Sequence, residues 1–363
     1  MTRLKVGIAG CGLVTQVEHL PNLLALPQLF EVVAIADPSA TVRTALSARY
    51  GIRAFESATG MMDSGLDAVV IATPDSYHAD LAVAGLERGL HVLSEKPLAY
   101  NTDDSARIAA ARDKAGRIVQ VGYMKRFDPA YLMLCDLLGK VSTPLRAVTV
   151  DVLDSGSDPF VAHHDMVVAD DIPQALIAEG GARRAAQVKT ALGTDADPLV
   201  TKGFSGPYSS SLVHDLNLVQ GLLDAAGARI GKPVGAAFIA GNSGGYLSAK
   251  LDPTDGLVTM IWVATPQLAY YSERISMIFD NSNFELRFPS PYLNHHPTEL
   301  IERRANGTAF EEIRHRPSYA EPFVEELKAW HAAITSGAKV VNTVEQAGID
   351  MGLFAKFAKL ALG

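Results

Sequence analysis

Hydrophobic and polar residues alternate in two different rhythms along this chain. In its first third, short runs rich in Val, Ile, Leu and Ala stand between longer segments with helical spacing. The short runs are Leu4–Ala9, Val32–Ala36, Ala68–Ala72, His91–Leu93 and Ile118–Val121. The helical segments are Val14–Leu26, Ala40–Tyr50, Ser76–Arg88 and Thr102–Ala115. Strands that alternate with helices predict a parallel sheet, and right-handed crossovers make it a doubly wound Rossmann fold.

The rhythm changes after Val121. One strand-like run, Leu145–Val152, precedes a polar, acidic segment over 154–171. The later strand-like runs are Val234–Ala240, Tyr246–Leu251, Leu257–Val263, Arg274–Phe279 and Phe284–Phe288. Helical spacing returns at Pro322–Thr335 and Val344–Leu362. Consecutive strands joined by short turns predict a mostly antiparallel sheet. We therefore expect an α/β chain, with an NAD-binding Rossmann domain over 1–122 and an α+β domain for substrate binding and oligomerisation over 123–363.

The composition excludes some classes of function but does not identify one. The 363 residues are 48% hydrophobic and 20% charged, which is typical of a globular protein with two domains. A net charge of -8 argues against a nucleic-acid partner, because a phosphate backbone requires a basic surface. Two cysteines predict no disulfide framework and favour a reducing compartment. No signal peptide or membrane-length apolar stretch is evident, so we expect a cytoplasmic protein with no membrane partner.

A glycine turn, Gly10-Cys11-Gly12-Leu13-Val14-Thr15, directly follows the first predicted strand and opens a helix. In such a turn the first glycine permits the tight bend and the second lets the backbone approach a pyrophosphate at the positive helix end. We expect Gly10, Gly12, Leu13 and Val14 to contact a dinucleotide. Thr15 stands where a third Gly or Ala is usual. The alternative is a structural strand–turn–helix connection that binds no ligand.

Asp37 ends the second predicted strand, at the distance expected for a carboxylate that binds the adenosine ribose. It favours NAD over NADP as the cofactor. Two alternatives stay open. Asp37 can serve as a turn or helix-capping residue before Pro38, and Arg43 is close enough in sequence to favour a phosphate instead.

The run His91–Ala99 leaves a buried strand at its carboxyl end, where α/β folds bind their ligands, and contains Glu95-Lys96-Pro97. Here the sequence resembles the Gfo/Idh/MocA oxidoreductases, which include glucose-fructose oxidoreductase and inositol dehydrogenase and carry a Glu-Lys-Pro signature. Two further segments support the resemblance. They are Ala72-Thr73-Pro74 followed by His78, and Gly122-Tyr123-Met124-Lys125-Arg126-Phe127-Asp128-Pro129.

This resemblance implies hydride transfer between the nicotinamide and a secondary hydroxyl of a sugar, sugar derivative or cyclic polyol. Lys96 would contact both cofactor and substrate and hydrogen-bond the reacting oxygen, since a lysine beside a cationic nicotinamide exchanges its proton more readily. The further residues that the resemblance assigns to the cofactor are Thr73, Pro74, His78 and Glu95. Those that it assigns to the substrate are Tyr123 and Arg126.

The family's second signature is a helix that carries an Asp and, four residues later, a His. The matching segment is Ser209–Asn217, where the pair is Ser210 and His214, because the Asp is missing. Both side chains would lie on one helix face and contact the substrate. His214 is the candidate general base, since imidazole titrates near neutral pH. The alternative is a histidine satisfied within the core.

The missing Asp keeps two other functions open. Some relatives retain NAD and cleave glycosides through transient oxidation and elimination, and others are non-catalytic dinucleotide sensors. The family pattern also implies a homodimer or homotetramer that assembles through the C-terminal sheet. We expect no metal site. His163-His164-Asp165 with Asp170-Asp171 is more typical of a solvated loop than of a ligand set, and Arg183-Arg184 lies on a helical insertion of unassigned role.

Overall fold

The structure is a computed structural model that describes residues 2–193 and 197–362. Two compact units share the chain, and each consists of segments that are separated in sequence. The first unit comprises Met1–Tyr123, His163–Thr194 and Phe323–Gly352, and the second comprises Met124–Ala162, Asp195–Pro322 and Leu353–Gly363. Two segments that follow residue 122 therefore pack with the Rossmann strands.

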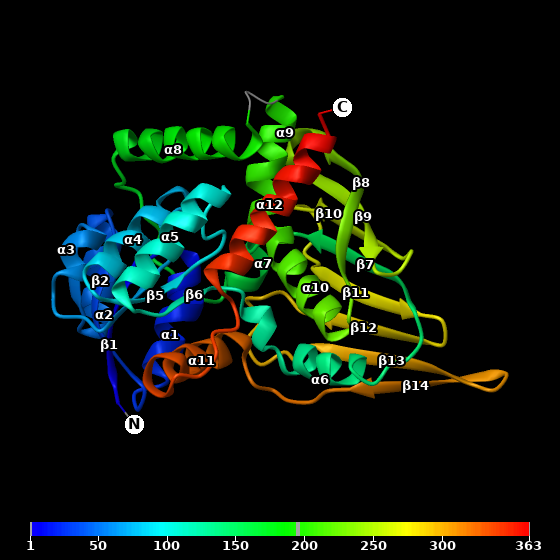
Figure 1. The fold of residues 1–363 in the computed structure, drawn as a ribbon. Coiled ribbons are helices and arrows are strands. Elements are labelled where there is room, and N and C mark those ends of the chain that lie inside the picture. Colours follow the sequence, from blue (N-terminus) through cyan, green and yellow to red (C-terminus); the bar gives the residue numbers. More distant parts are fainter. Residues whose placement is uncertain (1, 194–196, 363) are drawn as a thin grey trace. The chain divides into compact units, whose positions relative to one another are not determined.

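A parallel sheet forms the centre of the first unit (Figure 1). Its strands are β1 (Leu4–Ala9), β2 (Phe30–Ala36), β3 (Arg53–Phe55), β4 (Ala68–Ile71), β5 (His91–Ser94) and β6 (Val119–Val121). They lie side by side in the order β3-β2-β1-β4-β5-β6. The order reverses direction between β1 and β4, and ligands of doubly wound folds bind at the carboxyl ends of the strands near this point. The Rossmann prediction is confirmed.

Helices connect these strands and end where capping residues predict. They are α1 (Leu20–Leu24), α2 (Ala40–Tyr50), α3 (Ala58–Met62), α4 (His78–Glu87) and α5 (Thr102–Ala115), and Figure 1 shows α4 and α5 side by side. Ser39 caps α2 by accepting a hydrogen bond from the Val42 N–H, and Gly51 ends the helix in the left-handed conformation. The expected helix over Val14–Leu26 is instead a π-helical turn, Thr15–His19, followed by the short α1.

The first unit takes its core partly from the C-terminal part of the chain. Leu327 and Trp330 of α11 (Pro322–Ser336) are fully buried among side chains of the parallel sheet and its helices. The Trp330 ring stacks on Phe30 of β2, with ring centroids 5.9 Å apart. This packing explains why the segment belongs to the first unit. Helix α8 (Gln174–Leu192) also belongs to it, as do residues 344–352 of α12 (Val344–Leu360).

A large sheet forms the second unit. Its strands are β7 (Leu145–Asp154), β8 (Arg229–Ile239), β9 (Gly244–Asp252), β10 (Leu257–Ala264), β11 (Ser272–Phe279), β12 (Ser282–Phe288), β13 (Glu299–Asn306) and β14 (Ala309–His315). Their order is β14-β13-β12-β11-β7-β10-β9-β8. The pair β7–β10 is parallel and the other neighbours are antiparallel. The predicted α+β domain with a mostly antiparallel sheet is confirmed.

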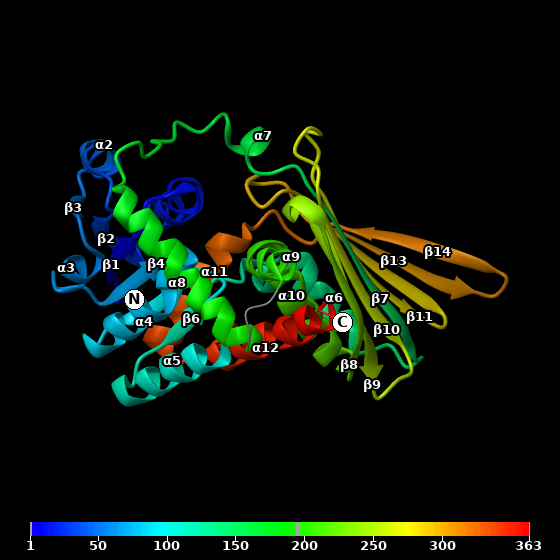
Figure 2. The ribbon, with the colours of Figure 1, turned by 90° about the horizontal axis from the view of Figure 1, so that it is seen from above.

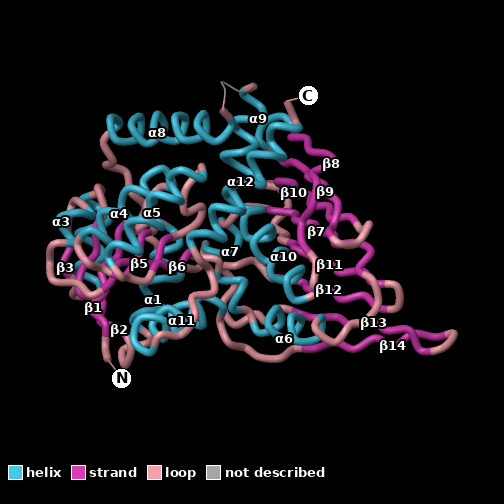
Figure 3. Tube along the Cα trace, in the orientation of Figure 1, coloured by secondary structure: helices cyan, strands magenta, loops and turns pink. Residues whose placement is uncertain are grey.

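Helices pack against one side of this sheet (Figure 3). Helix α6 (Pro129–Leu138) contacts β12 and β13, and α10 (Val213–Ala225) contacts β8. The remaining helical segments of this unit are α7 (Asp158–Val161), α9 (Pro198–Gly203), a π-helical stretch over Phe204–Leu212, and short 3-10 turns over Met124–Phe127 and Ala240–Asn242. The π-helical stretch runs directly into α10, so the segment predicted as one helix over Ser209–Asn217 spans two helix types.

Candidate functional site

The turn after β1 has the backbone geometry of a phosphate-binding loop. Gly10 adopts φ +87°, and a Cβ at this position would lie 2.4 Å from the Ala72 carbonyl oxygen, so only glycine fits. Gly12 is exposed, and a Cβ there would meet nothing within 4 Å. Its backbone is therefore open to an approaching ligand. Thr15, in the place of a third glycine, donates its hydroxyl to the Gly10 carbonyl at 2.7 Å and thereby stabilises the turn.

Asp37 lies beside this turn at the end of β2. Its Oδ2 accepts a hydrogen bond from the Cys11 N–H and its Oδ1 accepts one from the Ser39 N–H, both at 2.9 Å. Each carboxylate oxygen retains a lone pair for a further donor such as a ribose hydroxyl. Burial, followed by the charge of Asp37, raises the pKa of the Cys11 thiol. Burial and the neighbouring carboxylate therefore favour the thiol form of Cys11 over a reactive thiolate.

A cavity of about 920 Å³ opens at this edge of the sheet, within the first unit. Six of the residues predicted to bind the cofactor line it: Gly10, Gly12, Leu13, Asp37, Thr73 and Pro74. Four others are not among the lining residues: Val14, His78, Glu95 and Lys96. The volume is ample for an extended dinucleotide, and the open backbone at Gly12 fits a pyrophosphate.

His78 has a structural position in this arrangement. It is buried, with Nδ1 2.8 Å from the Pro97 carbonyl oxygen and Nε2 2.8 Å from the Thr73 carbonyl oxygen. The ring therefore links the loop after β4 to the loop after β5, which carries Lys96.

Lys96 is half-buried at the carboxyl end of β5, next to a buried carboxylate. Glu95 is 7% exposed, and its Oε1 lies 2.8 Å from Nε2 of His19. Burial opposes ionisation of Glu95, but the hydrogen bond from His19 and the charge of Lys96 hold its pKa below the usual value. Glu326 of α11 is also fully buried, and burial followed by the negative Glu95 raises its pKa well above the usual value. No sequence pattern pointed to His19 or Glu326, because both lie far from Glu95 along the chain.

Tyr123, predicted to contact the substrate, is 1% exposed. Burial, followed by the nearby Asp350 carboxylate, raises its pKa well above the usual value, and its carbonyl accepts a hydrogen bond from Asn342 at 3.0 Å. Its role toward substrate stays a prediction.

The other predicted substrate residues belong to the second unit. Arg126 donates Nη1 to the Asn217 carbonyl at 2.8 Å and lies over the Tyr131 ring. Ser210 is exposed and donates its hydroxyl to the Gly206 carbonyl at 2.6 Å. His214 is half-buried in the first turn of α10. Since Ser210 belongs to the π-helical stretch, the two signature positions sit across a change of helix type.

A buried charged cluster in the second unit was not predicted. Lys125 Nζ lies 2.6 Å from both carboxylate oxygens of Glu273, and Tyr271 donates its hydroxyl to the same carboxylate. Burial, followed by the charge of Glu273, raises the pKa of Asp215 well above the usual value. Lys125 and Asp215 both fall inside segments that the sequence singled out, but Glu273 lies on β11 and pairs with Lys125 only through the fold.

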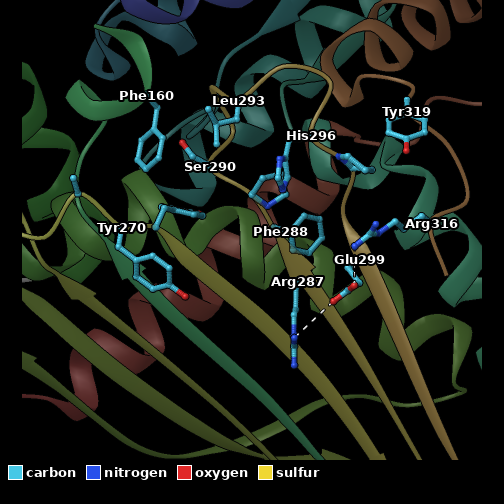
Figure 4. A pocket seen from close by; sticks show the side chains of 14 residues that line it. Phe160, Tyr270, Arg287, Phe288, Ser290, Leu293, His296, Glu299, Arg316 and Tyr319 are labelled. Carbon is cyan, nitrogen blue, oxygen red and sulfur yellow. Dashed lines mark hydrogen bonds and ion pairs between the residues drawn. The ribbon is translucent and has the colours of Figure 1, made fainter. Parts of the chain in front are cut away.

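A second cavity, of about 550 Å³, lies next to this cluster within the second unit (Figure 4). Aromatic rings line much of it, from Phe160, Tyr270, Tyr271, Phe288 and Tyr319. Arg287 and Arg316 reach Glu299 at 3.7 and 3.4 Å, and His296 adds an imidazole to the lining. Aromatic faces beside charged hydrogen-bonding groups suit a hydroxyl-rich ring.

Residues 163–192, here called the covering segment, border the first cavity. Met166, Val167, Val168 and Ala169 line it, as do residues at the start of α8. Gln16 fastens the segment to the glycine turn. Its Nε2 donates to the carbonyls of Val167 and Cys11, and its Oε1 accepts from the Val167 N–H.

Ion pairs hold both ends of the covering segment to the first unit. Arg49 pairs with Asp165, Arg184 with Asp75, and Arg183 with Asp80. Figure 2 shows the part of the segment before α8 reaching α2. Asp165, Asp170 and Asp171 are exposed, as expected of a solvated loop, and each also bonds to α2 or to Ser39 before it.

Within 2–193 and 197–362, no group of three or more His, Cys, Asp or Glu side chains is placed to hold a metal ion. In the same part of the chain no helix combines the length and apolar character that a membrane crossing requires.

Comparisons with known proteins agree with this geometry. A family model described as an oxidoreductase family with an NAD-binding Rossmann fold matches residues 4–123. Inositol 2-dehydrogenase 3 of Saccharopolyspora erythraea is 34% identical over 148 residues, which are 40% of this chain and 44% of that protein. The chain therefore matches less than half the length of this curated relative.

Solved structures resemble the chain over nearly its whole length. An aldose-aldose oxidoreductase from Caulobacter crescentus has a TM-score of 0.72 and 17% identity, covering 99% of this chain and 98% of that one. A 3-ketoreductase from Actinomadura kijaniata, solved with NADP, has a TM-score of 0.71 and 18% identity, covering 97% and 96%. At such identities the likeness shows the fold alone.

Proposed function

Because residues 4–123 place this chain in the Gfo/Idh/MocA family of NAD(P)-binding oxidoreductases, we propose that it is an NAD-dependent dehydrogenase. Its substrate would be a secondary hydroxyl of a sugar, sugar derivative or cyclic polyol. The observation that carries the proposal is the cavity in the first unit, where Gly10, Gly12 and Asp37 combine the groups that a dinucleotide needs. The identity with inositol 2-dehydrogenase 3 supports a polyol-like substrate.

Residues of this chain would hold the dinucleotide at two places. The backbone at Gly12 and the start of the following helix would bind the pyrophosphate, and Asp37 would accept hydrogen bonds from the adenosine ribose. When bound, the nicotinamide supplies the acceptor for a hydride. Thr73 and Pro74, in the loop after β4, line the same cavity.

Proton transfer would fall to Lys96 and His214. Lys96 would hydrogen-bond the reacting oxygen, and His214 would accept the hydroxyl proton as the carbinol carbon gives up its hydride. The two residues belong to different units, so their cooperation rests on the sequence pattern. Ser210 is uncharged and cannot supply the negative charge that the usual Asp gives at this position.

The second unit would contribute binding of the sugar ring and self-assembly. Exposed apolar side chains gather on the strand face defined by Leu153, Tyr246, Leu257 and Ile261, which share one side of the sheet by their register. We propose that this face forms a homodimer or homotetramer contact in the cytoplasm. Light scattering on the purified chain tests it, and a monomer at all concentrations would refute it.

The test of activity measures NADH formation with a panel of inositols, aldoses and glycosides, with NAD or NADP as cofactor. We compare the wild type with Lys96→Ala and His214→Asn, and use Lys114→Ala on the exposed face of α5 as the matched control. Loss of a proton-transferring group lowers kcat by about 10²–10⁴-fold, whereas dinucleotide affinity should change little in His214→Asn.

The other outcomes separate the rival functions. Glycoside cleavage without net NADH would favour the NAD-retaining elimination mechanism, and tight binding without turnover over the whole panel would favour a sensor. Either result would overturn the dehydrogenase proposal, as would turnover that survives in Lys96→Ala.

A further inference from the structure

Asp171 of the covering segment occupies the N-terminus of α2. Its Oδ2 accepts hydrogen bonds from the backbone N–H groups of Ala40 at 2.8 Å and Thr41 at 3.1 Å, and its Oδ1 accepts one from the Ser39 hydroxyl. The same three groups of an eleven-residue helix would otherwise be available to an anion. Asp171 is itself exposed, so it competes with water for these donors.

The contact of Asp171 with Ser39 bears on cofactor binding because Ser39 also contacts Asp37. Asp37 lines the cavity and lies two residues before Ser39, whose N–H it also binds. If Asp37 binds the ribose hydroxyls, a phosphate esterified to one of them must lie just beyond its carboxylate. The start of α2 supplies anion-binding donors from Ser39 onward, two residues after Asp37, and Asp171 fills them.

We propose that Asp171 is a specificity-determining residue that excludes NADP by placing its carboxylate at the site that the 2′-phosphate would need. The inference rests on the proposed dinucleotide function and goes beyond it, because it assigns cofactor choice to a second carboxylate outside the Rossmann strands. Asp37 discriminates by binding the ribose, and Asp171 discriminates by occupying the phosphate donors.

Neighbouring charges also disfavour a bound phosphate, with one exception. Asp170 accepts a hydrogen bond from the Thr41 hydroxyl at 3.1 Å beside Asp171, and Glu56 lines the cavity that Asp37 also lines, so two further negative charges would oppose a phosphate at the start of α2. The hydrogen bonds from Ser39 and Thr41 lower the pKa of Asp171, which keeps it ionised at neutral pH. Arg43 is the exception. Its Nη1 donates to the Asp37 and Pro38 carbonyls, which places a cation close enough to assist a phosphate once Asp171 is removed.

The experiment measures binding, so it does not depend on catalysis. NAD and NADP are titrated separately by calorimetry into the full chain, as wild type, Asp171→Ser and Asp171→Asn. Asp165→Asn is the matched control, because Asp165 is in the same segment but pairs with Arg49 near the other end of α2. Asp37→Ser alone and with Asp171→Ser then separates the two carboxylates.

We expect the wild type to bind NAD more tightly than NADP. Asp171→Ser should raise NADP affinity at least about tenfold, because the charge-assisted hydrogen bonds at Ser39, Ala40 and Thr41 become available to phosphate. Asp171→Asn should give a smaller gain in the same direction, since the amide oxygen still competes for these donors. Asp165→Asn should leave the ratio of the two affinities unchanged.

Three results would overturn the inference while leaving the proposed function intact. They are a wild type that binds both dinucleotides equally, an affinity ratio unchanged in Asp171→Ser with and without Asp37→Ser, and a loss of affinity for both dinucleotides in proportion. The last result would mean that Asp171 only fastens the covering segment. A wild type that binds neither dinucleotide would instead overturn the proposed function itself, and the inference with it.

Discussion

Replacement of Lys125 by methionine should destabilise the second unit severely. The Lys125 and Glu273 side chains are 8% and 0% exposed, and Lys125 is within 2.6 Å of both Glu273 oxygens. The variant leaves Glu273 ionised and buried, with a hydrogen bond from Tyr271 but without a counterion. Breaking a buried ion pair by removing one partner costs about 3–5 kcal/mol.

The neighbouring carboxyl cannot compensate for this loss. Asp215 is 1% exposed, and burial followed by the charge of Glu273 raises its pKa well above the usual value, so this carboxyl supplies no counterion for Glu273. Lys125 is therefore the cation that balances the Glu273 carboxylate in the wild-type cluster.

The assay is urea unfolding followed by tryptophan fluorescence. The chain has two tryptophans, Trp262 on β10 in the second unit and Trp330 in the first, so single-tryptophan backgrounds report each unit. Lys140→Met, an exposed lysine after α6, is the control and should change stability by less than about 0.5 kcal/mol. The double variant Lys125→Met with Glu273→Gln should recover most of the loss, since no buried charge then lacks a partner. A loss below about 1 kcal/mol in the single variant, or no recovery in the double, would refute the reasoning.

Two further predictions concern the first unit. Gly10→Ala should lower the free energy of unfolding by about 2–5 kcal/mol, because it combines a left-handed backbone with a Cβ 2.4 Å from a carbonyl oxygen. Gly12→Ala should instead lower dinucleotide affinity and leave the melting temperature nearly unchanged. Equal melting temperatures for the two variants would contradict this reading of the turn. Glu326 has a raised pKa, so the folded state binds its proton more tightly than the unfolded state, and its contribution to stability falls as pH rises above the ordinary glutamate range. Glu326→Gln should therefore stabilise the chain increasingly between pH 5 and pH 8 in thermal melts, and a gain that is independent of pH would count against a buried, protonated carboxyl.

The sequence predicted the bounds of elements in the first unit well where capping residues mark the ends of the helices. Strand β1 matches the expected Leu4–Ala9, and α2 and α5 match because Ser39 and Asn101 cap their starts and Gly51 and Gly116 end them. The exposed strand β3 and the short α3 were missed. Neither is long enough to show a period.

In the second unit, β13 and β14 were missed for a different reason. Both lie at one edge of the sheet and carry charges where a strand pattern would show apolar residues, with Arg303 bonded to Glu312 and Glu285 across strands. Charged edges protect a sheet from further pairing but hide it from a hydrophobicity pattern.

Part of the candidate site could likewise be predicted from local sequence, and part could not. The glycine turn and Asp37 follow from local spacing, and the structure brings them to one cavity. The contributions of Gln16 and Asp171 could not be predicted, because each acts through a partner more than a hundred residues away, Val167 and Ser39 respectively. The pairing of Lys125 with Glu273 has the same origin.

The burial of Trp330 and Leu327 in the first unit has a consequence for biosynthesis. A nascent chain that has emerged only as far as residue 123 contains every strand of the parallel sheet but lacks these two side chains of its core. The Rossmann unit therefore cannot finish packing until α11 has left the ribosome. Its exposed apolar surface around Phe30 would meanwhile be a natural substrate for chaperones, and a truncated gene product ending before α11 would keep that surface permanently.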